Sequence, residues 1–112
     1  MRREKSRLQE ATDKALEELR SRIGDTSCVE DQIHKLSKAL DGIDFYGIQL
    51  DAANGSSTLN YMFFLPDRTQ ISINSFPETL EKDVIAVNIF KKRKHLLGDF
   101  MTLGQLRDML LS

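Results

Sequence analysis

The spacing of apolar residues changes at about residue 43, and this change limits the folds that the chain can adopt. Over residues 3–23 and 27–40, apolar side chains recur every three or four positions, which predicts two helices. Beyond residue 43 the period becomes two, which is typical of half-buried strands. Four strands are predicted, over residues 43–50, 58–65, 69–75 and 84–91. Because short turns link them, we expect the strands to form an antiparallel meander.

Short polar motifs predict where the helices begin and end. Gly24 stands where a helix usually stops. Ser27 and Glu30 have the spacing of a capping box, so the second helix is expected to begin at Ser27. Thr102 and Gln105 repeat that spacing near the C-terminus and predict a final helix.

The expected domain organisation follows from these elements. The first helix carries a narrow, alanine-rich apolar stripe, which favours a docking seam over a core helix. Residues 78–83 are predicted to form a polar loop, and residues 91–101 an irregular, partly basic segment. We therefore expect residues 1–24 to form an N-terminal helical extension and residues 25–112 to form a single α+β domain. That domain would hold a four-stranded antiparallel sheet with helices packed on one face.

Composition and charge exclude several classes of protein. The chain has 112 residues and a net charge of -1, so it fits one domain with no overall field for nucleic acid or a membrane surface. No apolar run approaches the roughly 20 residues of a membrane span, and the basic N-terminus lacks the apolar region of a signal peptide. Cys28 is the one cysteine, which excludes an internal disulfide. These features predict a cytoplasmic protein.

Three short segments carry a family resemblance: Ile71-Ser72-Ile73, Phe76-Pro77-Glu78 and Ala86-Val87-Asn88-Ile89-Phe90. They are similar to the segments Ile-Ser-Ile-His-Thr-Trp-Pro-Glu and Ala-Val-Asp-Val-Phe of the prokaryotic S-adenosylmethionine decarboxylases. The predicted order over residues 29–90 (helix, hairpin, strand, Pro-Glu corner, strand) also resembles the protomer of that family. The resemblance implies a decarboxylase-like scaffold.

The residues that perform the chemistry of that family are replaced in this chain. In the family, a Glu-Ser pair cleaves itself and leaves a pyruvoyl group that acts as the electron sink. The matching positions here are Arg68 and Thr69, and Asn74 stands in place of a processing His. An amide does not titrate near neutral pH, so Asn74 cannot move the proton. Lys91 begins the segment where the family has an acid–base Cys. These departures imply an uncleaved, non-catalytic chain, and we expect no cofactor.

Two further readings of that region stay open. A pocket near Thr69, Asn74 and Glu78 would bind an amine or nucleoside, as a ligand-binding protein or an enzyme. The basic run would bind phosphate groups through Lys91, Lys92, Arg93 and Lys94. The alternative for the run is a solvated loop that protects a sheet end. The net charge and the lack of interleaved aromatics favour the loop, so we do not expect nucleic acid as a partner.

Protein binding is the function that we expect from the sequence, either with a second copy or with a partner that the chain inhibits, as immunity proteins do. Two sets of apolar residues are candidates for the contact: Leu8, Ala15 and Leu19 on the first helix, and Tyr61 and Phe63 on a free sheet face. The alternative is that these residues line the core. We expect no metal site, because His34 has no second ligand at a suitable spacing. Cys28 is expected to be a packed small side chain rather than a nucleophile.

Overall fold

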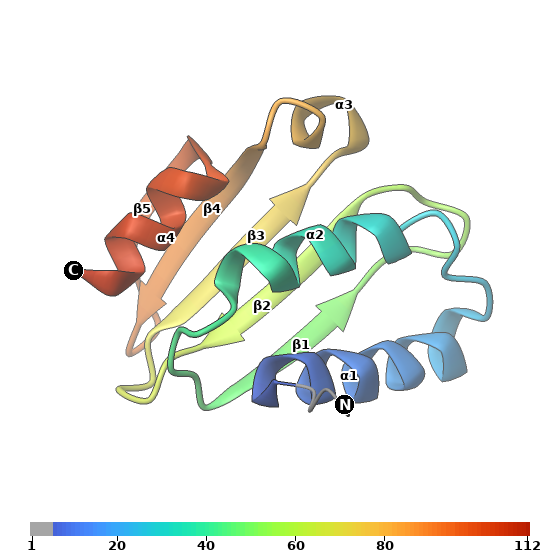
Figure 1. Cartoon of the computed structure of the whole chain (residues 1–112), viewed down its shortest axis with the longest axis horizontal. Coiled ribbons are helices and arrows are strands. Elements are labelled where there is room, and N and C mark those ends of the chain that lie inside the picture. Colours follow the sequence, from blue (N-terminus) through green and yellow to red (C-terminus); the bar gives the residue numbers. More distant parts are fainter. Residues whose placement is uncertain (1–5) are drawn as a thin grey trace, which may run out of the picture.

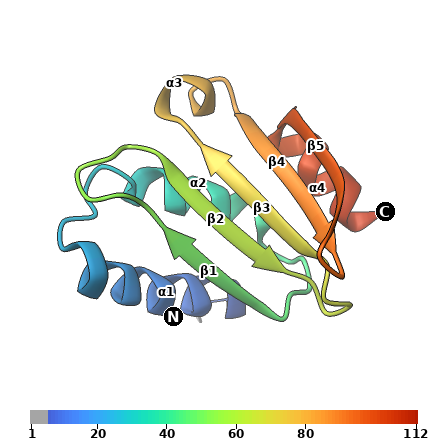
Figure 2. The ribbon, with the colours of Figure 1, turned by 180° about the vertical axis from the view of Figure 1, so that it is seen from behind.

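Helices α1 (Arg7–Ile23) and α2 (Glu30–Leu40) precede the strands in the computed structural model, which describes residues 6–112. The strands are β1 (Gly47–Asp51), β2 (Leu59–Phe64), β3 (Gln70–Ser75), β4 (Val84–Lys91) and β5 (Lys94–Thr102). A short helix, α3 (Pro77–Leu80), lies between β3 and β4, and α4 (Leu103–Leu111) ends the chain. The sheet order is β1-β2-β3-β4-β5, and each neighbouring pair is antiparallel. Helices α1, α2 and α4 cover one face, and Figure 2 shows the other face bare.

The α+β fold agrees with the sequence prediction, but the sheet has five strands rather than four. The predicted irregular segment over residues 91–101 is wrong for most of its length, because all of Lys94–Thr102 except the bulged Leu96 pairs with β4. The basic run conceals the turn: Lys91 pairs with Lys94, so Lys92 and Arg93 alone reverse the chain. The predicted loop over residues 78–83 also contains part of α3, which begins at Pro77.

Helix α1 begins with a capping box made by Ser6 and Gln9 and ends at Gly24. The expected start at residue 3 lies outside the described residues. The predicted capping box of Ser27 and Glu30 is wrong, because α2 begins at Glu30 without a side-chain cap. The box of Thr102 and Gln105 at the start of α4 is confirmed.

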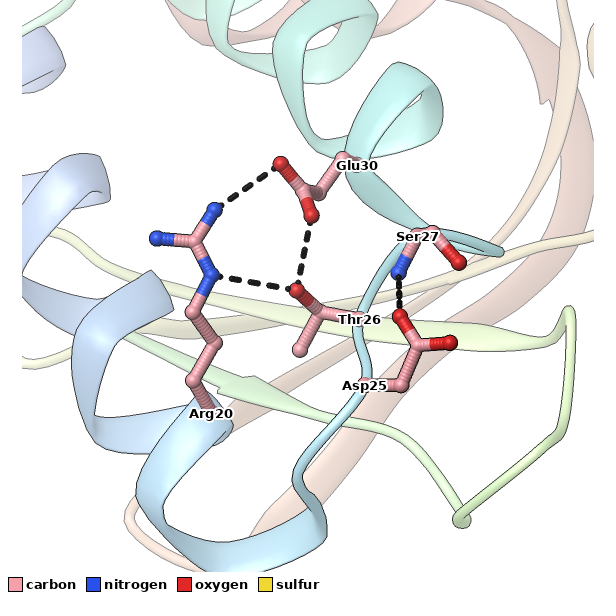
Figure 3. Close-up of polar contacts among 5 residues, drawn as sticks. All are labelled: Arg20, Asp25, Thr26, Ser27 and Glu30. Atoms are coloured by element: carbon pink, nitrogen blue, oxygen red, sulfur yellow. Dashed lines mark hydrogen bonds and ion pairs between the residues drawn. The ribbon is translucent and has the colours of Figure 1, made fainter.

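A polar cluster joins α1 to the start of α2 (Figure 3). Arg20 donates to Glu30 Oε1 at 2.9 Å and to the Thr26 hydroxyl at 3.3 Å, and that hydroxyl donates to Glu30 Oε2 at 2.9 Å. Just before the helix, the Asp25 carboxylate accepts the Ser27 N–H at 2.9 Å. This N–H, with the Ser27 hydroxyl, lowers the pKa of Asp25 from its ordinary value. The cluster therefore holds the two helices together at their connection.

One hydrophobic core lies between the sheet and the helices, and α1 contributes to it. Leu8, Ala15 and Leu19 belong to the same buried cluster as the apolar residues of α2 and the sheet. Inside it, the hydroxyls of Thr12, Ser37 and Tyr61 form a ring with separations of 3.1 to 3.3 Å. Burial raises the pKa of Tyr61, although the hydroxyls of Ser37 and Thr12 partly offset the effect. The apolar side of α1 is therefore part of the core, and the division of the chain at residue 24 stays a prediction.

Candidate functional site

The three residues expected to form a ligand pocket do not come together. Thr69 is almost fully buried just before β3, while Asn74 lies five positions later on that strand's opposite face. Five strand positions span about 17 Å. Glu78 lies beyond the other end of β3, in α3. A site shared by Thr69, Asn74 and Glu78 is therefore not formed.

Thr69 has a structural role in the turn between β2 and β3. Its N–H donates to Asp67 Oδ1 at 3.0 Å. The Thr69 hydroxyl also donates a hydrogen bond to the Asp67 carboxylate. This bond has the largest effect and the N–H the next largest, and both lower the pKa of Asp67 from its ordinary value. Thr69 thus serves to hold a tight turn.

The residues expected to meet a partner are buried inside this chain. Leu19, Tyr61 and Phe63 have no exposed surface, and Leu8 and Ala15 are 3% and 8% exposed. Of the two sequence interpretations, the structure therefore agrees with core packing. The reason for Tyr61 and Phe63 is strand register: they alternate with Asn60, Met62 and Phe64, which take the bare face.

The bare face of the sheet is largely polar at its centre. Asn60 donates to Ser72 Oγ at 3.1 Å and to Asn74 Oδ1 at 2.9 Å. Towards β5, the amide oxygen of Asn88 lies 3.1 Å from His95 Nε2. Amide and hydroxyl side chains of this kind are compatible with water, while Met62 and Phe64 add apolar surface to the same face.

The β1 edge of the sheet is covered by α1. Arg22 of α1 donates through Nη2 to the Leu50 carbonyl at 2.7 Å, and its Nη1 lies 3.3 Å from Asp51 Oδ1. The strand has only five residues. A short strand beside a helix is one of the ways in which proteins prevent unwanted strand pairing.

The β5 edge is long and uncovered. The strand has nine residues, and the outer side of β5 faces no other strand among residues 6–112. Leu96, Leu97 and Phe100 are 55%, 37% and 63% exposed. Leu97 pairs with Ile89 and Phe100 with Ala86, so the two side chains lie on opposite faces of the sheet. We call these three residues along the edge the β5 patch. A bulge opposite Ile89 and Phe90 leaves Leu96 without a partner on β4. Exposed apolar side chains on an open strand edge are typical of a surface that pairs with another chain.

The basic run occupies the hairpin between β4 and β5, next to the β2–β3 turn (Figure 2). Lys91 forms an ion pair with Asp67 at 3.5 Å, and Lys94 is the first residue of β5. Lys92 and Arg93 form the turn itself. The structure thus brings two members of the run to one tip, where Arg68 joins them.

The other reactive side chains form no site. Cys28 is exposed rather than packed, so that expectation is wrong. Among residues 6–112, no group of His, Cys, Asp and Glu side chains could hold a metal ion, and no helix is long and apolar enough to span a membrane.

Comparisons with protein families, with curated proteins and with solved structures found no match for this chain. The resemblance to the decarboxylases therefore rests on the short motifs alone.

The sequence analysis did not find the β5 patch or the role of Arg68. Leu96, Leu97 and Phe100 follow the basic run without a clean alternation, because the bulge at Leu96 shifts the register by one residue. Arg68 was not connected with the basic run, because its place beside Lys92 and Arg93 depends on a hairpin more than twenty residues later in the chain.

Proposed function

We propose that this chain is a non-catalytic protein-binding module that associates with a second copy of itself through the β5 edge. The single observation that carries the proposal is the uncovered nine-residue strand with the β5 patch along it. The polar groups of an open edge are satisfied when a second strand pairs with it, and the exposed apolar side chains are buried in the same step.

A second copy fits this edge because of the order of its residues. A two-fold axis at Gly98 would place β5 antiparallel to its copy, which is the arrangement of every other pair in the sheet. In that register, Leu96 lies opposite Phe100 on both sides of the axis, and Leu97 lies opposite Asp99. Apolar cross-strand pairs of this kind stabilise a sheet. An axis at Asp99 would instead place two carboxylates opposite each other, so the sequence disfavours that neighbouring register.

The proposal is tested by sedimentation equilibrium from low micromolar to hundreds of micromolar protein. We expect a dimer for the wild type and a monomer for Leu96→Lys/Phe100→Lys. The control is Tyr46→Ser, which removes an aromatic side chain that is 81% exposed but lies away from β5. A monomeric wild type at every concentration, or a double variant that still dimerises, would contradict the proposal.

We also propose that the chain does not process itself at Arg68–Thr69. This is supported by the hydrogen bonds that engage Thr69 with Asp67, and by the separation of Thr69 from Asn74. Intact-mass spectrometry should give one full-length species. Two fragments that meet between Arg68 and Thr69 would restore the enzyme reading.

A further inference from the structure

A hollow of about 290 Å³ lies where the β2–β3 turn meets the β4–β5 hairpin. Its lining residues are Arg68, Gln70, Phe90, Lys92 and Arg93, and we call it the basic hollow. Its volume is at the lower limit of small-molecule sites, about 300 Å³. Figure 2 shows the two turns side by side at the same end of the sheet.

Among residues 6–112, no acidic side chain is paired with any of the three cations of the basic hollow. Within residues 6–112, the side chains of Arg68, Lys92 and Arg93 have neither a hydrogen-bond partner nor an ion pair. The nearby carboxylate of Asp67 is already paired with Lys91. Like charges gathered around one hollow repel one another, and an anion between them would remove that repulsion.

The same three residues have a backbone conformation that side chains disfavour. The φ angles are 70° at Arg68, 50° at Lys92 and 65° at Arg93. Asp83 is the one other described non-glycine residue with positive φ. A two-residue hairpin with positive φ at both central positions normally contains Asn-Gly or a similar pair. Backbone strain of this kind tends to be kept where it serves a function, and here it coincides with the three cations of the basic hollow.

The remaining lining residues indicate the chemistry of the ligand. Phe90 is half-buried on the bare face of the sheet, between Gln70 on β3 and His95 on β5. His95 contacts the Phe90 ring from one side, with ring centres 5.0 Å apart. Gln70 uses its amide N–H on Met62 Sδ at 3.5 Å, which leaves its carbonyl oxygen as an acceptor. The hollow therefore combines an aromatic face, an amide and three cations.

We propose that the basic hollow binds a nucleoside di- or triphosphate, with its phosphates on Arg68, Lys92 and Arg93 and its base stacked on Phe90. Guanidinium groups match phosphate oxygens in geometry as well as charge. Stacking on an aromatic ring is available to every base. The site is distinct from the pocket expected at Thr69, Asn74 and Glu78, and it does not depend on pairing at the β5 edge.

Three probes separate the parts of this proposal by isothermal titration calorimetry: ATP, inorganic tripolyphosphate and adenosine. We expect ATP to bind most tightly, tripolyphosphate about tenfold more weakly because it lacks the stacking base, and adenosine weakest. The affinity for ATP should fall with added salt. An undetectable affinity for millimolar ATP, or equal affinities for ATP and tripolyphosphate, would overturn the proposal.

One variant turns the strained hairpin into a test. Lys92→Asn/Arg93→Gly removes two cations and supplies the residue pair that this turn type favours. We expect its melting temperature to rise while its affinity for ATP falls at least about tenfold. The control is Lys38→Gln/Lys82→Gln, which removes two charges away from the hollow and should leave ATP affinity unchanged. Equal loss in both variants would mean general charge attraction and would overturn the site.

A second pair of variants guards against misfolding and assigns the base. Arg68→Gly relieves the positive φ and should weaken both ATP and tripolyphosphate. Phe90→Leu should reduce ATP affinity to that of tripolyphosphate and leave tripolyphosphate unchanged. Each measurement is repeated on Leu96→Lys/Phe100→Lys, so that loss of self-association is not mistaken for loss of the ligand. A single-stranded oligonucleotide could instead displace ATP, with an affinity that falls much more steeply with salt. That result would indicate a nucleic acid as the ligand and would contradict the proposal.

Discussion

The two edges of the sheet are built in opposite ways. The β1 edge is five residues long, and α1 covers it with Arg22 on the Leu50 carbonyl. The β5 edge is nine residues long, carries three exposed apolar side chains, and has no further strand beside it among residues 6–112. One sheet therefore has a protected edge at β1 and an open edge at β5, so the open edge is not a general property of this fold.

The open edge also carries features that restrict how it can pair. The bulge at Leu96 and the carboxylate of Asp99 are devices that disfavour indiscriminate strand addition. A two-fold axis at Asp99 would place two carboxylates opposite each other, so that pairing register is disfavoured. The bulge and the carboxylate thus limit which strands can pair with β5, but they still allow pairing. The comparison indicates that three features of an edge strand act together: its length, the presence of a covering helix and its charged side chains. Together they decide whether the edge is protected from pairing or is available as an interface.

The largest expected effect tests the covered side. Deleting residues 1–23 removes Leu19 and Thr12 from the core and exposes the β1 edge, so we expect loss of the cooperative thermal transition measured by circular dichroism. As a milder version, Leu19→Ala should lower the free energy of unfolding by about 3 kcal/mol. The exposed Leu111→Ala should stay within about 0.5 kcal/mol. A truncated chain that still melts cooperatively would support the separate extension that the sequence predicted.

The next effect concerns the buried hydroxyl ring behind β2. Tyr61→Phe keeps the packing of the aromatic side chain but removes the one hydroxyl that contacts both Thr12 and Ser37. Because those two remain bonded to each other at 3.1 Å, we expect a loss of only about 1 kcal/mol in urea unfolding. A loss below the experimental error would show that the ring does not help to hold α1 on the sheet.

A smaller effect is expected at the β1 edge itself. Arg22→Ala removes the donor on the Leu50 carbonyl and should cost about 0.5–1 kcal/mol in the same unfolding assay, because the side chain is half-exposed. Arg22→Lys keeps the charge but loses the planar fork, so it should recover only part of that stability. If Arg22→Ala also increased self-association, the contact from α1, rather than the short length of β1, would be what prevents pairing at that edge.

The smallest effect is a pH dependence at the β2–β3 turn. The folded pKa of Asp67 is lowered, so its contribution to stability is present above the ordinary pKa of 3.8 and is lost as the pH falls through the folded value. In Thr69→Ala the pKa of Asp67 should move back towards 3.8, and the acid loss of stability should shrink. Carboxyl-detected NMR titration of both proteins measures the shift. An identical Asp67 titration in the two proteins would exclude Thr69 as its cause.

Sequence reasoning succeeded where a local pattern determines the local structure. The alternation in β2 and β3 and the capping box at Thr102 are visible without knowledge of their neighbours. It failed at β5, because Lys92 and Arg93 form a turn that usually needs glycine or asparagine. For α1 the helix was predicted, but its burial was not, because a thin alanine-rich stripe does not reveal that Thr12 bonds Tyr61 in the core.

The candidate surfaces could be predicted only in part. The basic run was recognised, but the contribution of Arg68 depends on contacts between distant turns. Tyr61 and Phe63 were expected on a free sheet face, with the core as the alternative, because periodicity alone cannot say whether Phe63 or its neighbour Phe64 enters the core. If the alternation along β2 were shifted by one residue, the side chains that now face the core would lie on the bare face of the sheet.

Hydrogen–deuterium exchange at low and high protein concentration compares the two edges most directly. If β5 pairs with a second copy, backbone amides within Lys94–Thr102 should exchange more slowly as the concentration rises, while exchange in Gly47–Asp51 stays unchanged. In Leu96→Lys/Phe100→Lys, the concentration dependence in β5 should disappear. Exchange in β5 that is independent of concentration, or protection that instead develops in β1, would contradict the proposal that the open edge is the interface.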